Sequence, residues 1–217
     1  MNRSEADRLW EIASVLARDA ADVSRAAGRR PANLPPLLFF TDPERTPRPW
    51  ETAARLPAGS GVVYRAFGAP DARDTALRLR EATRRRDGLL LIGLDAELAE
   101  AVEADGVHLP ERALDQAAAL AARRPGWRIT GAAHAAGALD RLAGLDAVVL
   151  SPVFPAGGAS AARPALGLDG FADLVRGAPV PAYALGGVNG RNARGLIGSG
   201  ACGLAAVSGI RTAFGPG

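Results

Sequence analysis

Two glycine-containing turns near the C-terminus are the strongest chemical feature of this sequence. The pair Gly186-Gly187 ends one apolar run, and the triplet Val207-Ser208-Gly209 ends the next. Glycine adopts backbone angles that other residues avoid, and successive N–H groups in such turns can surround an anion. The alternative is that glycine only lets the chain turn after a strand. On the first interpretation, the two turns predict a phosphate site.

Further candidate residues stand within or just after other apolar runs, where ligand-facing residues of an α/β protein are expected. They are Asp42, Tyr64, Arg65, His108, His134, Pro152 and Phe154. A histidine exchanges protons near neutral pH, and an arginine holds an anion. These residues are therefore the candidates for a catalytic site and a substrate pocket.

Each charged candidate also has a structural interpretation. Asp42 precedes a proline and either faces a ligand or caps a turn. Arg65 either faces a ligand or makes an ordinary salt bridge. His108 lies inside an apolar run, which favours a structural hydrogen bond over catalysis. His134 is either an acid/base or a loop histidine without a role, and Ser208 is expected to fix the phosphate turn.

Eight apolar, strand-like runs alternate with segments of helical periodicity, which predicts a parallel sheet. The runs are 37–40, 61–64, 89–92, 106–109, 128–130, 147–150, 182–185 and 204–207. Helices are expected at 75–86, 96–103, 113–123 and 192–199. Eight strands suit a closed barrel, so the predicted fold is α/β, a (β/α)8 barrel, rather than an open doubly wound sheet.

The pattern of apolar residues near the N-terminus predicts an amphipathic helix. Ser4 can cap it, Asp7 lies in its first turn, and apolar residues at 9, 12, 13 and 16 form one face. We expect residues 1–34 to be a helical extension that closes the barrel bottom or joins a partner subunit, which makes a homodimer possible. Residues 35–217 are then the barrel.

Composition excludes several functions. All 26 basic residues are arginines, so Schiff-base chemistry, which needs a lysine amine, is excluded. The arginines are dispersed and not interleaved with aromatic residues, which argues against nucleic-acid binding. No apolar stretch reaches the ~20 residues of a membrane helix, so no membrane contact is expected. One cysteine, Cys202, favours a reducing cytoplasm as the location.

The order and spacing of several motifs resemble the thiamine phosphate synthase/TenI family across residues 36 to 213. The motifs are Thr41-Asp42, Asp105-Gly-Val-His108-Leu, Pro152-Val-Phe-Pro155, Leu166-Gly-Leu168, Leu185-Gly-Gly-Val188 and Val207-Ser-Gly-Ile210. The resemblance implies a (β/α)8 barrel and a role in thiamine biosynthesis. Family members join a pyrimidine diphosphate to a thiazole phosphate or isomerise the thiazole phosphate, and the two glycine turns would hold that phosphate.

The sequence departs from the synthase pattern where the family binds diphosphate and magnesium. Of the family's Gln-x-Arg-x-Lys pattern only Arg65 remains, and Gly93-Leu94 stands where the family has Asn-Asp. Asp95 and Glu111 are each displaced from the expected magnesium positions, and the loop 156–162 lacks Thr and Lys. The departures favour a monophosphate ligand over a diphosphate.

Three hypotheses follow. The chain is a thiamine-pathway enzyme, either a divergent synthase or a thiazole tautomerase in which His134 is the acid/base and Arg65 assists. Alternatively, it is a non-catalytic carrier or sensor of thiazole phosphate or thiamine phosphate. The third possibility is a barrel with a different phosphorylated ligand. No cofactor is expected, and Mg²⁺ is required only on the synthase hypothesis.

Overall fold

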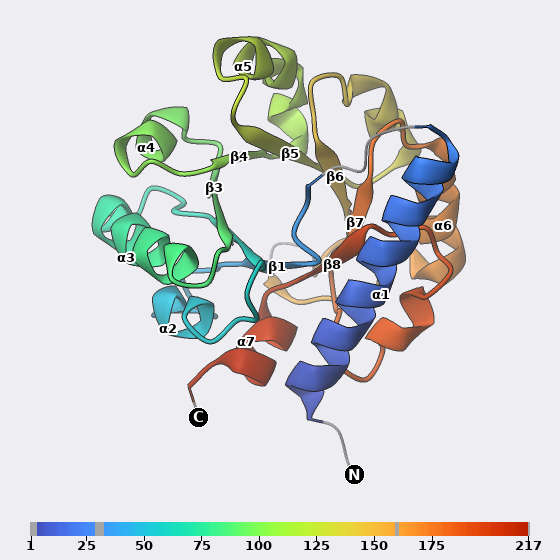
Figure 1. Cartoon of the computed structure of the whole chain (residues 1–217), viewed down its shortest axis with the longest axis horizontal. Helices are drawn as coiled ribbons and strands as arrows, with labels where there is room; N and C mark the ends of the chain where they lie inside the picture. The colour runs from blue at the N-terminus through green and yellow to red at the C-terminus, as the bar shows by residue number, and fades with distance from the viewer. Residues whose placement is uncertain (1–3, 29–32, 159–160, 217) are drawn as a thin grey trace.

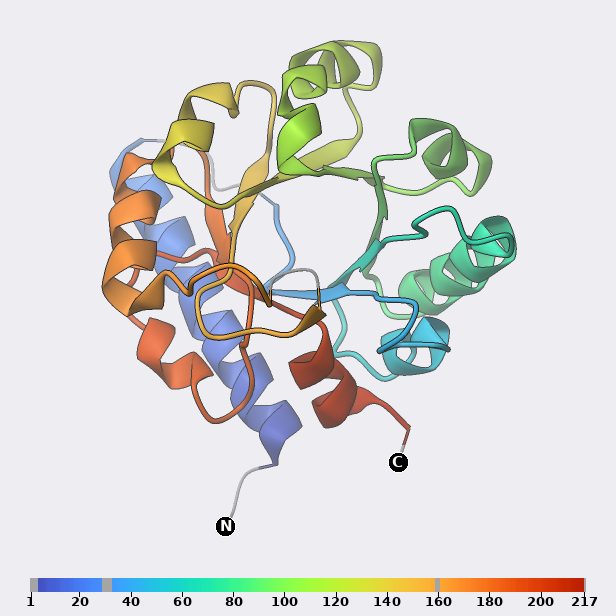
Figure 2. The ribbon, with the colours of Figure 1, turned by 180° about the vertical axis from the view of Figure 1, so that it is seen from behind.

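The computed structural model describes residues 4–28, 33–158 and 161–216. Its centre is a closed barrel of eight parallel strands in sequence order, with β1 paired to both β2 and β8 (Figures 1 and 2). The strands are β1 (Leu37–Phe40), β2 (Gly61–Tyr64), β3 (Leu89–Gly93), β4 (Gly106–Leu109), β5 (Arg128–Ala133), β6 (Ala147–Leu150), β7 (Ala182–Ala184) and β8 (Gly203–Ala206). The predicted (β/α)8 barrel is confirmed.

Helices and short 3-10 turns surround the strands (Figure 1). The helices are α1 (Glu5–Ala26), α2 (Pro49–Ala53), α3 (Ala72–Arg84), α4 (Ala96–Ala101), α5 (Ala117–Arg123), α6 (Gly167–Gly177) and α7 (Ser208–Phe214). The 3-10 turns are η1 (Glu111–Gln116), η2 (Ala136–Arg141) and η4 (Ala193–Leu196).

Most element boundaries differ from the predicted ones by a few residues, and two of the differences have identifiable reasons. Strand β5 continues past Thr130 to Ala133, because Ala133 pairs with Leu150 of β6. The helix expected at 192–199 is only the 3-10 turn η4. Gly195 and Gly198 lie in this segment, and glycine lowers the stability of a helix by roughly 1 kcal/mol per residue.

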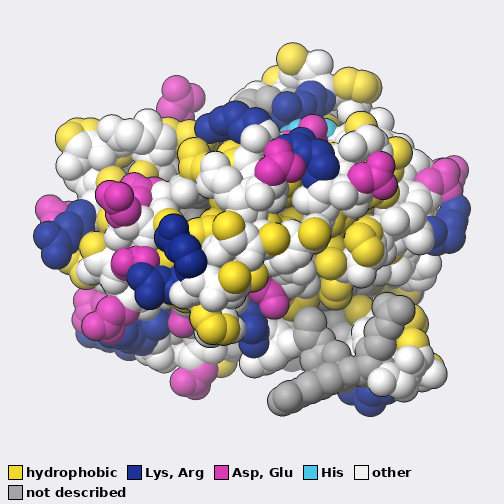
Figure 3. Space-filling view, turned by 90° about the horizontal axis from the view of Figure 1, so that it is seen from above, with side chains coloured by type: hydrophobic (Ala, Val, Ile, Leu, Met, Phe, Trp, Pro, Cys, Tyr) yellow, Lys and Arg dark blue, Asp and Glu magenta, His cyan; other side chains and the backbone are white. Residues whose placement is uncertain are grey.

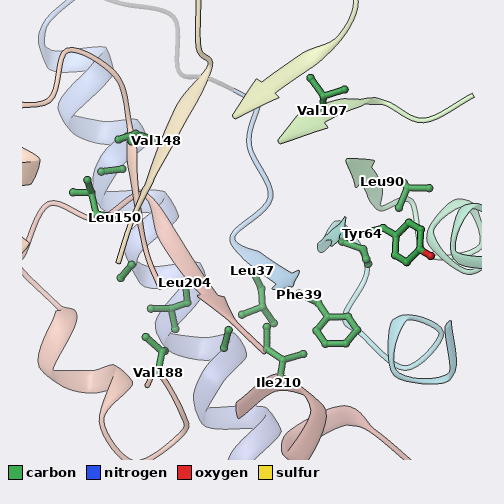
Figure 4. Packing of buried hydrophobic residues seen from close by; sticks show 14 of the residues in the cluster. Leu37, Phe39, Tyr64, Leu90, Val107, Val148, Leu150, Val188, Leu204 and Ile210 are labelled. Atoms are coloured by element: carbon green, nitrogen blue, oxygen red, sulfur yellow. The ribbon is translucent and has the colours of Figure 1, made fainter. Parts of the chain in front are cut away.

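Alternation along the strands divides the core into two layers. Side chains such as Leu37, Phe39 and Val107 point outward and pack beneath the helices (Figure 4). Leu38 and Phe40 belong instead to a smaller cluster that includes residues of five other strands. This second cluster fills the barrel, so any ligand must bind at an end of the barrel and not within it.

Helix α1 packs along the barrel against β8, β1, η4 and α7. Its N-cap is Ser4, whose side chain accepts from the backbone N–H of Asp7 in a capping box. Leu9 and Leu16 are buried in the outer layer. Farther along the helix, Ala20 packs against the inner cluster. It lies next to Leu34, Pro181 and Cys202, which come just before β1, β7 and β8. The helix is thus part of the barrel wall and reaches its amino-terminal end.

Within the described residues, no helix combines the length and hydropathy needed to cross a membrane.

Candidate functional site

One cavity of about 310 Å³ lies at the carboxyl ends of β7, β8, β1 and β2. Residues 185–189, 207–209 and 155–157 line it together with the side chains of Arg45 and Arg65. All five residues predicted to bind phosphate are in this lining, although phosphate binding itself stays a prediction. Segments distant in sequence meet here because the carboxyl ends of parallel strands share one end of a barrel.

The turn after β7 requires glycine at two successive positions. The φ angles of Gly186 and Gly187 are +99° and +66°. A Cβ on Gly186 would lie 2.6 Å from the Cα of Pro152, and one on Gly187 would lie 2.5 Å from the carbonyl oxygen of Pro155. The Asn192 side-chain amide donates to the Gly187 carbonyl at 2.8 Å. The turn is therefore held tightly against the loop after β6.

The turns after β7 and β8 form one surface. Gly209 approaches the Val188 carbonyl so closely that a Cβ would lie 2.2 Å from its oxygen. In the described part of the chain, no group accepts from the backbone N–H of Gly186 or Gly187. Unpaired N–H groups beside a cavity need an acceptor, and an oxyanion supplies one.

Arg65 follows β2 and reaches back over the barrel mouth. Its Nε donates to the Thr41 carbonyl at 2.8 Å, and its guanidinium carbon lies 5.6 and 5.2 Å from the ring centres of Phe40 and Phe67. The carboxylate of Asp42 is 3.7 Å from Nη2. Burial lowers the pKa of Arg65 to about 10, so the side chain stays cationic at neutral pH.

Arg45 is a second cavity-lining cation, and it was not predicted from the sequence. Its Nη2 donates to Asp42 Oδ2 at 2.7 Å, and its backbone N–H donates to Asp42 Oδ1 at 3.1 Å. These bonds hold the pKa of Asp42 below its usual value. Asp42 thus both closes a turn and orients two arginines. The spacing Asp-x-x-Arg just after a strand was the available signal.

Tyr64 corrects one sequence-based expectation. It lies in the outer layer, 5% exposed, beside Thr75 of α3 rather than in the substrate pocket (Figure 4). Strand alternation explains this, because Val63 of β2 belongs to the inner cluster and its neighbour must point outward.

His108 lies inside the barrel and has a structural environment. Its Nδ1 is 2.9 Å from Thr130 Oγ1, and its ring packs edge-on against Phe40 at 4.9 Å between centres. Burial, followed by the charges of Arg65 and His134, lowers its pKa to about 3. The imidazole is therefore neutral, and the structural hydrogen bond expected from the sequence is present.

His134 directly follows β5 and is half-buried. Its Nδ1 donates to the Ser151 carbonyl at 2.7 Å, and its backbone N–H donates to Glu111 at 2.8 Å. Because a carbonyl only accepts, Nδ1 carries a proton in this contact. Figure 3 shows histidine atoms exposed among acidic and basic side chains at its upper edge. His134 does not line the 310 Å³ cavity.

Pro152 and Phe154 support the cavity without lining it. The Phe154 backbone N–H donates to the Gly186 carbonyl at 3.0 Å, and both residues limit the space available to the glycine turn. Pro152 and Phe154 therefore lie behind the proposed phosphate site and do not contact the cavity.

The acidic residues that could replace the missing magnesium ligands are engaged elsewhere. Asp95 caps α4 by accepting from the Leu98 N–H at 2.8 Å, and Glu111 accepts from the His134 N–H. Asp42 is bonded to Arg45. Among the described residues, no three His, Cys, Asp or Glu side chains come together as a metal site. The donor set does not fit Mg²⁺.

The class of protein that the structure defines is a closed (β/α)8 barrel with glycine-containing turns after β7 and β8 at one cavity. The profile of the thiamine monophosphate synthase family (TMP-TENI) matches residues 39–210. The chain belongs to this family, as the sequence motifs predicted.

Relatives of known name agree with this assignment. A thiamine-phosphate synthase of Thermobifida fusca is 36% identical over 75% of this chain and 78% of its own length. One from Archaeoglobus fulgidus is 34% identical over 64% of this chain, and the match spans 66% of that relative's length. The solved thiamine phosphate pyrophosphorylase of Pyrococcus furiosus has a TM-score of 0.67 at 25% identity, covering 85% of this chain and 93% of its own.

Proposed function

We propose that this protein binds a thiazole-type phosphate monoester with its phosphate on the turns after β7 and β8. The proposal rests on one observation: both turns and the side chains of Arg45 and Arg65 line the same cavity. Gly186 and Gly187 line the cavity, and their backbone N–H groups have no acceptor among the described residues. The names of the relatives support a ligand from thiamine biosynthesis.

We propose proton transfer on the thiazole ring as the reaction, with His134 as acid/base. Its Nδ1 is directed to the Ser151 carbonyl, so proton exchange with a ligand would take place at Nε2. Arg65 follows β2 and His134 follows β5, so both stand at the carboxyl end of the barrel. A ligand extending from the turns past Arg65 would approach His134, and Arg65 would stabilise negative charge that develops on the ring.

A second candidate is a carrier or sensor that binds the same ligand without changing it. One observation favours it, namely that His134 does not line the cavity. The divergent synthase hypothesis has less support, because the acidic residues near the barrel mouth do not assemble as magnesium ligands.

Substitution of Ser208 tests the phosphate site. Ser208 lines the cavity and its side chain is exposed, so Ser208→Asp adds a negative charge without disturbing the core. We expect Ser208→Asp to weaken binding of a thiazole phosphate monoester at least tenfold by calorimetry, with Ser208→Ala close to wild type. Equal affinity in all three proteins would refute the proposed site.

Isomerisation of the thiazole phosphate, followed by NMR, tests the chemistry. His134→Ala should abolish turnover while leaving affinity within a few-fold of wild type. Tight binding without turnover in the wild-type protein would replace the tautomerase with the carrier. Magnesium-dependent formation of thiamine phosphate would establish the synthase instead.

A further inference from the structure

We propose that helix α1 holds the glycine turn after β7 in its binding conformation, through contacts of Glu5 and Arg8 with Gly190. Glu5 and Arg8 are then positioning residues of the ligand site, although they lie 185 and 182 residues from Gly190 in the sequence. This inference rests on the proposed function, since it takes the phosphate to lie on the turns. It gives the N-terminal helix a role in binding.

Both backbone polar groups of Gly190 are bonded to the start of α1. The Gly190 N–H donates to Glu5 Oε1 at 3.3 Å, and the Gly190 carbonyl accepts from Arg8 Nε at 3.1 Å. Residues three positions apart lie on the same face of a helix, so one face of α1 supplies both bonds. Gly190 is buried and Glu5 is half-buried, which shields the contact from solvent.

Close packing, and not backbone conformation, requires glycine at position 190. A Cβ there would lie 2.4 Å from Glu5 Cγ and 3.0 Å from the Glu5 carbonyl oxygen. Gly186 and Gly187 have positive φ angles, whereas Gly190 does not. The absence of a side chain at Gly190 therefore serves the approach of α1 to this loop.

A hydrogen-bonded loop connects Gly190 to the cavity. The Asn189 N–H donates to Asn192 Oδ1 at 2.9 Å, and the Asn192 side-chain amide donates to the Gly187 carbonyl at 2.8 Å. The side-chain amide of Asn189 donates to the same carbonyl at 3.2 Å, and Asn189 itself lines the cavity. A shift of Gly190 would therefore be passed to the Gly187 peptide through Asn189 and Asn192.

Helix α1 also supports the turn after β8. It packs against β8 and against α7, which begins at Ser208, and it lies beside α7 in both ribbon views (Figures 1 and 2). Gly209 in turn lies against the loop after β7, because a Cβ on it would be 3.2 Å from the Cα of Asn189. One helix thus stands behind both turns. Support of this kind fixes a site before the ligand arrives and reduces the entropy cost of binding.

Thermodynamic linkage makes the effect mutual. If the contact with α1 favours the turn conformation that binds an anion, an anion on the turn must strengthen the contact with α1 to the same extent. Local opening of the contact exposes the Gly190 N–H to hydrogen exchange. The exchange rate of this amide should therefore report whether the cavity is occupied.

Titration of the ¹⁵N-labelled full chain with inorganic phosphate at constant ionic strength tests the role of α1. The Kd is read from the backbone amide signals of Gly186 and Gly187. We expect Glu5→Ala to raise this Kd at least threefold and Gly190→Ala to raise it at least tenfold. Glu5→Gln keeps an oxygen acceptor for the Gly190 N–H and removes a negative charge, so it should bind phosphate as tightly as wild type or more tightly.

Two control variants separate this role from general stability. Asp22→Ala removes an exposed ion pair at the other end of α1, and Gly126→Ala adds a Cβ with no atom within 4 Å at a glycine without a positive φ. Both should leave the phosphate Kd within 1.5-fold of wild type. If the charge of Glu5 alone mattered, Glu5→Ala and Glu5→Gln would both bind phosphate more tightly, and the proposed contact would be wrong.

Hydrogen exchange supplies the second measurement. Saturating phosphate should slow exchange of the Gly190 amide at least threefold in wild type and leave it unchanged in Glu5→Ala. An unchanged Kd in both Glu5→Ala and Gly190→Ala, or no change of Gly190 exchange in wild type, would overturn the role of α1 while the phosphate turns stand. If the wild-type amides of Gly186 and Gly187 do not respond to phosphate, the proposed function fails, and this role fails with it.

Discussion

Gly187→Ala separates the conformational and steric demands of the phosphate turn. Gly187 has φ +66° and its Cβ would lie 2.5 Å from the Pro155 carbonyl oxygen. Gly198 has φ +82° but open space around its Cβ position, so Gly198→Ala is the matched control. The left-handed conformation costs a non-glycine residue ~1–2 kcal/mol, and forcing atoms into a packed region costs a further ~1–3 kcal/mol.

Urea denaturation should therefore show Gly198→Ala less stable than wild type by ~1–2 kcal/mol and Gly187→Ala by ~2–5 kcal/mol. The added Cβ of Gly187→Ala clashes with the Pro155 carbonyl oxygen and pushes the turn away from the loop after β6. Only Gly187→Ala should therefore lose affinity for the phosphate monoester. Calorimetry of both variants measures this loss. If the two variants lose equal stability and bind alike, the turn is not held by its contact with Pro155, and the reasoning is wrong.

Three further predictions concern stability. The pKa of His108 is lowered to about 3 when folded, from 6.5, so only the unfolded chain takes up a proton as the pH falls through this window. Stability should then decrease from pH 7 to pH 5, and His108→Gln should flatten the change in urea midpoint. Asp105→Ala should cost about 3 kcal/mol, because its carboxylate accepts from Arg80 at 2.6 and 3.2 Å and from a β3 N–H. The exposed Glu103→Ala should leave the denaturation curve unchanged, and a loss equal to that of Asp105→Ala would contradict the role of burial. Ser4→Ala removes the α1 cap and should cost ~1 kcal/mol in the same assay.

The barrel was predictable because its signals are local. Most strands are short apolar runs bounded by polar, proline or glycine residues, and eight such runs in order leave few alternatives. The glycine turns were predictable for the same reason, since backbone angles depend on residue type at that position. Their meeting in one cavity followed from the shared direction of the strands.

Side-chain direction was the part that local signals did not determine. Tyr64 was placed in the pocket because it ends a strand, but strand phase turns it outward beneath α3. Arg45 was missed because its role depends on the Asp42 carboxylate and on Gly158, which lies far away in sequence. The Tyr64 error concerns the face that a strand residue presents, which a shift of one position reverses, whereas the role of Arg45 depends on contacts between separate loops.

The location of positive charge links these observations. The loop after β6 carries no cation at 155–158, whereas the loop after β1 directs Arg45 toward that same loop. A cation anchored to Asp42 cannot follow a ligand that moves, so it favours one anion position over a range of them. Such fixed charge discriminates between ligands by position as well as by total charge. The cavity should therefore select a ligand by the position of its phosphate relative to Arg45, and Asp42→Asn, which weakens the hold on Arg45, should widen the range of phosphates that bind, as measured by calorimetry.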